Sequence, residues 1–269
     1  SHDSRTAWVT LQENNGLAVV DIRSATVTDL VGLGKKNHME AGNGLDASNR
    51  DDAINIQPWP VLGTYMPDSI FSYRTRGKTY LVTANEGDGR EYLYEIGEDG
   101  NPNDCPPPAV EDDGDCIVYT DEARVKDVVL DDTVFTDPAT LQEDENLGRI
   151  KMLSTEGNLD DDAEYEEIHT FGARSISIWT PDGTRVFDTG DTMEQVTADA
   201  LTPDFDCFED AENDPELDPE DCSDFNSTND ENQSFDNRSD DKGPEPEGVV
   251  VGKVKGRYYA FVGLERVGG

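Results

Sequence analysis

Short apolar runs, separated by turn residues and acidic stretches, set the pattern of this chain. Residues 17–22 (LAVVDI) follow the turn signal Asn14-Asn15-Gly16. Residues 174–179 (RSISIW) alternate between polar and apolar side chains before the turn Thr180-Pro181-Asp182-Gly183 and a return run at 184–187. Alternation with a period of two is typical of half-buried strands, and Asn-Gly and Asp-Gly steps are typical of tight turns. These segments therefore predict β-hairpins.

Helical signals are few and short. Asp137-Pro138 places a capping side chain before a proline at the first helical position, which predicts one to three helical turns up to Leu147. A second short helix is expected over residues 193–201. The chain is therefore expected to be mainly β.

One hairpin pattern recurs along the chain. Three stretches each contain a basic residue, an apolar run and a closing glutamate: SRTAWVTLQE ends at Glu13, GKTYLVTANE at Glu86 and GRYYAFVGLE at Glu265. The last two also match upstream, where Pro67-Asp68 aligns with Pro246-Glu247. Both of these units read as a strand, a glycine turn and a second strand.

A repeated hairpin cannot bury both of its faces alone, and radial stacking of such sheets makes a β-propeller. We therefore predict a mainly β fold of the WD40/YVTN-like propeller type, in a single partial domain over residues 1–269. Its first residues lie in the middle of a repeat and its last residues follow a strand, so we expect a part of a longer propeller. Pairing of the terminal strands to close the ring is the alternative.

Two segments rich in proline and acidic residues, 98–116 and 204–224, interrupt this frame as polar insertions. Each contains two cysteines: Cys105 and Cys116 in the first, Cys207 and Cys222 in the second. Their spacing fits neither a zinc knuckle nor a redox motif. We predict two loop-stapling disulfides and an oxidising compartment, the alternative being four free thiols in a cytosolic protein.

Charge narrows the range of partners. The chain has 60 acidic and 21 basic residues, a formal net charge of −39. Nucleic acid and anionic membrane surfaces would repel it, and no apolar run approaches the roughly 20 residues of a membrane span. Such acidity has two physical explanations, a saline environment that screens repulsion or bound divalent cations that cross-link carboxylates.

Several longer stretches resemble the choice-of-anchor I family. They are VTLQENNGLAVVDI, GNGLDASNRDDAINI, YLVTANEGDGREY, LQEDENLGRIK, NDENQSFDNRSDDKGPEPEGVVVG and YAFVGLERVGG. This family comprises secreted or surface β-propeller domains and includes mesenchyme-specific cell-surface glycoproteins and bacterial proteins labelled alkaline phosphatases. The resemblance runs from residue 6 to residue 269, broken mainly at the two insertions. It implies a propeller in an extracellular, cell-surface or periplasmic setting, whereas a fold does not fix an activity.

Clustered carboxylates and Asn side chains are the ligands that Ca²⁺ prefers. Three clusters supply them: Asp46, Asn49, Asp51 and Asp52; Asn85, Glu86, Asp88 and Glu91; and Asp230, Glu231, Asp236, Asn237, Asp240 and Asp241, followed by Glu245 and Glu247. In a propeller the repeated strand ends converge, so Glu13, Glu86 and Glu265 are expected to approach one another. We predict that at least one cluster binds Ca²⁺, with several ions allowed; solvation, or pairing with Arg90 and Arg266, is the alternative.

A fourth cluster has the alternate spacing of an EF-hand start, with Asn158, Asp160, Asp162 and Glu164 as its oxygen donors. Ala163 stands where the turn glycine belongs, and His169 stands where the bidentate glutamate belongs. A proper EF-hand is therefore not expected. A looser Ca²⁺ loop and a plain acidic turn both remain open.

Common catalytic signatures are missing from the sequence, namely G-x-S-x-G, H-E-x-x-H and the P-loop, and the chain has only three histidines, His2, His38 and His169. Metal-assisted phosphoester hydrolysis needs only carboxylates, a cation and positive groups. Its candidate catalytic residues are Arg238, Asp240, Asp241 and Lys242, with Arg50, Arg90 and Arg266 as further positive groups; salt bridging is their alternative role. Three N-glycosylation sequons start at Asn226, Asn232 and Asn237.

The sequence thus predicts a secreted or cell-surface calcium-binding propeller module with a binding or matrix role. Its expected partners are divalent cations and other surface or matrix proteins, or the rest of its own parent chain. A calcium-dependent phosphomonoesterase is the alternative from another class. Adaptation of the surface to salt alone is the third possibility.

Overall fold

The computed structural model describes residues 1–51, 53–95, 105, 110–112, 115–200, 224–228 and 234–266. Within them the fold is mainly β, as predicted, with five sheets and two short α-helices, α1 (Pro138–Leu141) and α2 (Thr192–Ala200). The Asp137 side chain caps α1 by accepting a hydrogen bond from the Thr140 backbone N–H at 3.2 Å. Neither described helix has the length and apolar character needed to cross a membrane.

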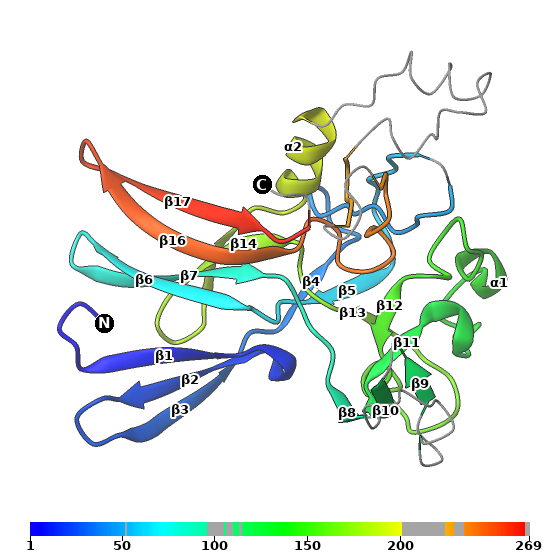
Figure 1. Cartoon of the computed structure of the whole chain (residues 1–269), viewed down its shortest axis with the longest axis horizontal. Coiled ribbons are helices and arrows are strands. Elements are labelled where there is room, and N and C mark those ends of the chain that lie inside the picture. The colour runs from blue at the N-terminus through cyan, green and yellow to red at the C-terminus, as the bar shows by residue number, and fades with distance from the viewer. Residues whose placement is uncertain are drawn as a thin grey trace.

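Three antiparallel sheets lie along one side of the molecule (Figure 1). The first has the order β1-β2-β3, the second β15-β14-β7-β6, and the third is the hairpin β16-β17. The strands are β1 (Thr6–Leu11), β2 (Gly16–Asp21), β3 (Thr26–Gly32), β6 (Ser69–Thr75), β7 (Lys78–Asn85), β14 (Ser175–Trp179), β15 (Arg185–Asp188), β16 (Pro246–Val254) and β17 (Arg257–Leu264).

The predicted hairpin repeat is confirmed in β6-β7 and β16-β17. Arg76 and Gly77 in the first turn have φ of 48° and 81°, and Lys255 and Gly256 in the second have φ of 48° and 84°. Positive φ at both central residues is the geometry of a type I′ turn, whose twist matches that of the flanking strands. Two sequence-distant segments therefore form the same local structure.

The two hairpins pack against each other. The Ser69 hydroxyl on β6 donates to the Glu247 carbonyl at 2.7 Å and accepts from the Val249 N–H at 2.9 Å. At the far end of the strands, the Tyr258 hydroxyl donates to the Arg74 carbonyl at 2.6 Å. β6 also contacts β1, so the three sheets form one stack.

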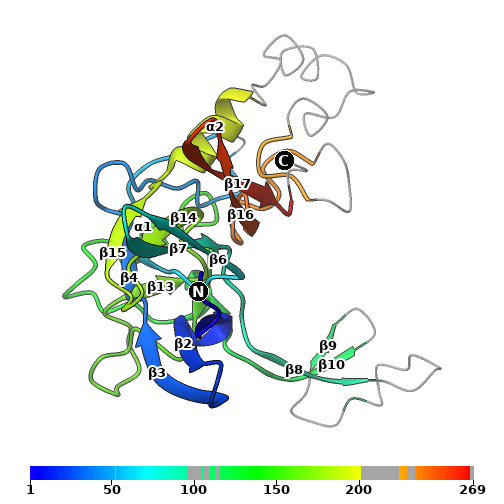
Figure 2. The same ribbon diagram turned by 90° about the vertical axis from the view of Figure 1, so that its left-hand side faces the viewer.

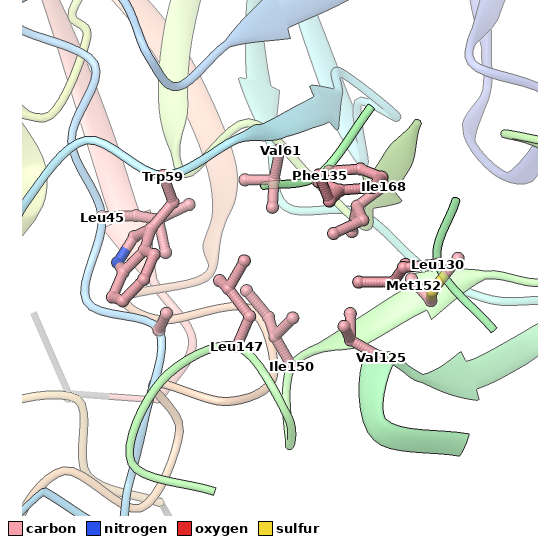
Figure 3. Close-up of a cluster of buried hydrophobic side chains, with 11 residues drawn as sticks. Leu45, Trp59, Val61, Val125, Leu130, Phe135, Leu147, Ile150, Met152 and Ile168 are labelled. Carbon is pink, nitrogen blue, oxygen red and sulfur yellow. The ribbon is translucent and has the colours of Figure 1, made fainter. Parts of the chain in front are cut away.

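A fourth sheet carries the main hydrophobic core. Its order is β11-β12-β13-β5-β4, in which β13 and β5 pair in parallel. Its apolar side chains pack with those of neighbouring loops in one cluster (Figure 3): Leu45, Ala47, Trp59, Val61, Val125, Leu130, Phe135, Leu147, Ile150, Met152 and Ile168. The strands are β4 (Lys35–Asn37), β5 (Val61–Thr64), β11 (Glu122–Arg124), β12 (Lys151–Leu153) and β13 (Ile168–Thr170).

The fifth sheet has the order β8-β10-β9 and projects from the rest of the molecule (Figure 2). β8 is Glu91–Glu95, β9 is Val110–Asp112 and β10 is Asp115–Thr120. The predicted disulfide between Cys105 and Cys116 is present, and β9 lies inside the loop that it closes. The other predicted pair, Cys207 with Cys222, lies outside the described residues.

Two glycines let distant loops cross at the end of β7. Gly87 and Gly172 have φ of 90° and 71°, and a Cβ on Gly172 would lie 1.8 Å from the Glu86 carbonyl oxygen. The Ala173 N–H donates to the Asn85 carbonyl at 3.1 Å beside this crossing. The crossing therefore fixes Glu86 and Arg174 relative to each other. The strands of the described residues close into no barrel, and a propeller ring stays a prediction.

Candidate metal centre

Two loops far apart in the sequence bring three carboxylates together. Asp46 and Asp51 come from the loop before β5, and Asp236 comes from the segment before β16. One oxygen of each lies within 4.8 Å of the others. Asp46 is fully buried and Asp236 is 3% exposed. We call these three residues the aspartate pocket.

The backbone holds Asp46 in place. It lies between Leu45 and Ala47, two members of the main core, so its position is tied to that core. Its carboxylate accepts the Asn55 N–H at 2.6 Å, and its own N–H donates to the Glu194 carboxylate on α2 at 2.8 Å. The bond from Asn55 holds the Asp46 carboxylate in one orientation.

The Asp236 carboxylate uses only one of its two oxygens for hydrogen bonds among the described residues. The Ser239 hydroxyl donates to its Oδ1, while its buried Oδ2 has no hydrogen-bond partner among the described residues. Asn226 is in the same condition: its Nδ2 donates to the Ser239 hydroxyl at 2.8 Å, and its buried Oδ1 lacks a partner in the described part of the chain. Ser239 thus links two side chains that each keep one unused, buried oxygen.

Burial shapes the electrostatics of the pocket. It is the main cause that raises the pKa of both Asp46 and Asp236, and the negative charge of neighbouring carboxylates raises them further. Three ionised carboxylates this close require a cation, or one of them must hold a proton.

Arg174, the buried cation beside the pocket, is already engaged. Its guanidinium donates to the Glu194 carboxylate at 2.6 Å, to the Asp46 carbonyl at 2.7 Å and to the Ser239 carbonyl at 2.7 Å. It braces both loops that form the aspartate pocket. Its charge is paired with Glu194 rather than with a carboxylate of the aspartate pocket.

A second group of carboxylates, which we call the glutamate cluster, consists of Glu86, Glu245 and Glu265, each with one oxygen within 4.8 Å of the others. Here the protein supplies the cations. Lys242 lies 2.6 Å from Glu86 and 3.3 Å from Glu245, and Glu245 also pairs with Arg238 and Arg266. Burial opposes ionisation of Glu245, but these three positive groups outweigh it and lower its pKa.

The predicted convergence of repeat glutamates is thus seen for Glu86 and Glu265. Glu13 lies close by, since the Gln12 amide donates to Glu86 at 3.3 Å and the Arg90 guanidinium donates to the Glu13 carbonyl at 2.9 Å. Arg90 itself pairs with Asp121. Lys242 and Arg238, which lie elsewhere in the sequence, neutralise the glutamates together with Arg266.

The four residues offered for catalysis are all in ion pairs. Asp240 pairs with Arg124 at 2.6 Å and Arg149 at 3.1 Å. Asp241 pairs with Lys151 at 3.0 Å and Arg238 at 2.6 Å. Lys242 pairs with Glu86 and Glu245, as described above. The positive groups here neutralise carboxylates of the same chain, which was the alternative role considered from the sequence.

The remaining predicted ligands are scattered. Asn49 accepts a hydrogen bond from Arg149. Asn85 is buried and hydrogen-bonded to Thr83, Ser175 and Ser177. Asp88 and Glu247 are exposed. Asp52 lies outside the described residues. In the EF-hand-like loop, Asp160 and Asp162 lie with Glu166 rather than with Glu164, all three exposed or half-buried. The N–H groups of Asp162 and Glu164 donate to Asp160 and Asp162 in this loop.

Sequence reasoning missed Arg174 and Glu194, and it noted Asn226 only as the start of a sequon. Arg174 and Glu194 belong to a strand-like and a helical pattern, and nothing near them in the sequence indicates a charged site. Asn226 lies in a polar, acid-rich stretch where one more Asn carries no signal. Only the three-dimensional structure brings these residues together.

Fold and site define a class: a mainly β protein whose stacked hairpin sheets carry buried carboxylate clusters on their connecting loops. The whole chain, residues 1–269, matches the model of the choice-of-anchor I domain, and the chain belongs to that family. The resemblance read from the sequence is thereby confirmed.

Two relatives are similar over different spans. The mesenchyme-specific cell surface glycoprotein of Strongylocentrotus purpuratus is 31% identical over 249 residues, which cover 89% of this chain and 29% of that protein. Gigasin-3a of Magallana gigas is 29% identical over 130 residues, 48% of this chain and 40% of that protein. The chain thus spans less than half the length of both curated relatives. No solved structure matches it.

Proposed function

We propose that this chain is an extracellular or cell-surface module with a binding or matrix role, stabilised by Ca²⁺. Membership of the choice-of-anchor I family and similarity to a protein named as a cell surface glycoprotein support this location. The disulfide between Cys105 and Cys116 is consistent with an oxidising compartment, the periplasm included.

The aspartate pocket is the observation that carries the calcium part of the proposal. Its three carboxylates each place one oxygen within 4.8 Å of the others, Asp46 and Asp236 are buried, and the buried Oδ2 of Asp236 has no hydrogen-bond partner among the described residues. Carboxylate oxygens at fixed positions suit a hard cation such as Ca²⁺. A chain of net charge −39 would gain stability from such an ion.

We also propose that the three stacked sheets are blades of a partial propeller. The repeated hairpins with matching turns, and the packing of β16 and β1 on β6, support this arrangement. Divalent cations are one set of partners. Other surface or matrix proteins, or further parts of a longer parent chain, are the second set. Nucleic acid is not a partner on charge grounds.

Thermal unfolding with and without a chelator tests the calcium part. We expect the melting temperature to fall when EDTA replaces Ca²⁺, because the ligand-bound native state loses its linked binding energy. Hydrolysis of p-nitrophenyl phosphate, measured in parallel, addresses the enzymatic alternative. Turnover that disappears with chelator and in Asp240→Asn would favour a phosphomonoesterase instead, since that aspartate belongs to the residues offered for catalysis.

A further inference from the structure

We propose that the ends of the hairpins β6-β7 and β16-β17 bind a sulfated polysaccharide. Six exposed basic residues form this surface, which we call the hairpin patch: Arg74, Arg76, Lys78, Lys253, Lys255 and Arg257. The proposal goes beyond a calcium-stabilised module. It takes from the proposed function only the extracellular or cell-surface location, where such polysaccharides occur.

The charge of the two hairpins is opposite to that of the chain as a whole. Residues 69–85 and 248–264 each contain three basic residues and no acidic residue. With 60 acidic residues among 269, a stretch of 17 residues would hold about four of them on average. The two hairpins are therefore positive segments in a chain of net charge −39.

The cations of the hairpin patch also differ in their partners from those near the carboxylate clusters. Arg124, Lys151 and Lys242 each lie 2.6 to 3.0 Å from a carboxylate oxygen. In the hairpin patch, by contrast, no ion pair joins any of the six basic residues to a carboxylate of the described part of the chain. Their positive charges face solvent and are available to a ligand.

Tyrosine rings hold the two hairpin ends side by side (Figure 1). Tyr73 stacks on Tyr80 with ring centres 5.7 Å apart, and it contacts Tyr258 of the other hairpin at 5.3 Å. The Tyr258 hydroxyl donates to the Arg74 carbonyl at 2.6 Å, and the Lys253 ammonium lies 5.1 Å from the centre of the Tyr258 ring. The cations of both hairpins are therefore carried by strands that are fixed to each other, which lowers the ordering cost of binding.

A surface of this kind fits a polyanion. Clusters of Lys and Arg are typical of surfaces that bind nucleic acid or heparin, which is a sulfated polysaccharide. A DNA duplex is stiff over about 50 nm, so it would extend from the hairpin patch along the acidic surface, which repels it. A short polysaccharide can contact the hairpin patch alone, because charges more than about 8 Å away are largely screened at physiological ionic strength.

Sulfate groups suit the hairpin patch better than carboxylates do. A sulfate ester stays ionised at physiological pH, and its three terminal oxygens can accept hydrogen bonds from cations of both hairpins at once. The chain itself carries 60 acidic side chains, so a surface that favoured carboxylates would draw other copies of the chain to it. A sulfated polysaccharide carries a different anion, and it is therefore the occupant that we choose.

The test measures the binding of heparin to the full chain by calorimetry, in Ca²⁺ and in EDTA. The patch variant is Arg76→Asn/Lys255→Asn, since both residues have φ of 48°, a conformation that Asn adopts more readily than most residues. The matched control, Lys35→Gln/Lys126→Gln, removes two cations that already pair with carboxylates at 3.1 and 2.8 Å. Heparin should bind the wild type and the control alike, and the patch variant at least about tenfold more weakly.

Salt dependence and hydrogen exchange add two further readouts. The affinity of the wild type for heparin should fall as the NaCl concentration rises, and it should fall more steeply than that of the patch variant, because contact through fewer cations releases fewer counterions. Hydrogen exchange on the wild type covers a patch variant that does not fold. Heparin should slow exchange in residues 72–80 and 252–260 more than in β12.

Three results would overturn the proposal. The first is a wild type that does not bind heparin. The second is a patch variant that binds heparin as tightly as the wild type; if that binding also needs Ca²⁺, the ion bridges sulfates to carboxylates and the hairpin patch has no part in it. The third is polyglutamate or duplex DNA that binds as tightly as heparin, which would show that the hairpin patch takes another polyanion. None of these results decides the calcium part of the proposed function, which the chelator experiment tests by itself.

Discussion

Buried side chains with a positive charge are held by carbonyl groups as much as by carboxylates in this protein. The Lys36 ammonium donates to the Ala173 carbonyl at 2.8 Å and to the Gly190 carbonyl at 2.7 Å, with Asp188 at 3.6 Å. Burial lowers its pKa, while Asp188 acts in the opposite direction. Arg174 shows the same mixture of partners. Such groups cost little only while every partner stays in place.

Because His38 lies close to these cations, we expect the free energy of unfolding to depend on pH. Burial is the main cause that lowers its pKa well below 6.5, and the positive charges of Lys36 and Arg174 lower it further. The native state thus keeps His38 neutral where the unfolded chain protonates it. The contribution of His38 to stability is complete above pH 6.5 and is lost as the pH falls, by at most about 1.4 kcal/mol per pH unit.

Urea unfolding between pH 7.5 and 5 measures this effect. In His38→Gln the free energy of unfolding should decline less steeply below pH 6.5 than in the wild type, because Gln takes up no proton. Many carboxylates begin to titrate at the acidic end, so the difference between the two proteins is the quantity to read. His2→Gln, at an exposed position, should follow the wild-type curve. Parallel curves for His38→Gln and the wild type would contradict the prediction.

Among the structural elements, the crossing at Gly87 and Gly172 is the most demanding connection. Gly172→Ala would force a left-handed backbone on alanine and put its Cβ 1.8 Å from the Glu86 carbonyl oxygen. Gly77→Ala in the β6-β7 turn is a matched control, since it has φ of 81° but open space around it. The control should lose about 1–2 kcal/mol for the backbone conformation.

Gly172→Ala should lose at least about 2 kcal/mol more than the control, because the clash with a backbone atom adds an overpacking cost. Chemical denaturation of both variants gives the two values. Equal losses would mean that the crossing relaxes easily and does not fix the site. A larger loss for Gly172→Ala would support its role in holding Glu86 and Arg174 in position.

The sequence predicted the local elements well because local signals define them. Alternating residues and glycine turns were enough for β6-β7 and β16-β17, and an Asp-Pro step was enough for the start of α1. The mixed fourth sheet could not be predicted in this way. Its parallel pairing of β13 with β5 joins segments about a hundred residues apart, and no turn signal reports such a pairing.

The candidate site shows the same division. Composition identified the acidic loops, and Asp46, Asp51 and Asp236 were all among the predicted ligands. Tertiary structure decides which of the predicted ligands lie together. Asp236 lies beside Asp46 and Asp51. Asp240 and Asp241, a few residues later, form ion pairs with arginines and a lysine instead. The sequence offered Arg90 and Arg266 as cations for the glutamates. In the structure Arg266 pairs with Glu245, whereas Arg90 pairs with Asp121 and Lys242 pairs with Glu86.

On the scale of the whole molecule, the net charge of −39 raises the question of whether salt alone could stabilise the fold. Repulsion between exposed carboxylates falls as ionic strength rises, since the screening length is about 10 Å at 0.1 M and about 3 Å at 1 M salt. Buried groups are screened much less. Surface repulsion and the aspartate pocket should therefore respond differently to sodium chloride.

Melting temperatures at about 0.05, 0.15 and 1 M NaCl, each with EDTA and with Ca²⁺, separate surface repulsion from ion binding, because the screening length falls severalfold over this range. Sodium chloride should raise the melting temperature in both conditions, because it screens the exposed acids. The gap between EDTA and Ca²⁺ should persist at about 1 M NaCl in the wild type, since the buried carboxylates of Asp46 and Asp236 are screened much less than exposed ones. In Asp236→Asn the gap should be small at every salt concentration. If 1 M NaCl with EDTA restores the wild type to its melting temperature in Ca²⁺, the stability of the protein depends on its surface charge and the pocket contributes nothing.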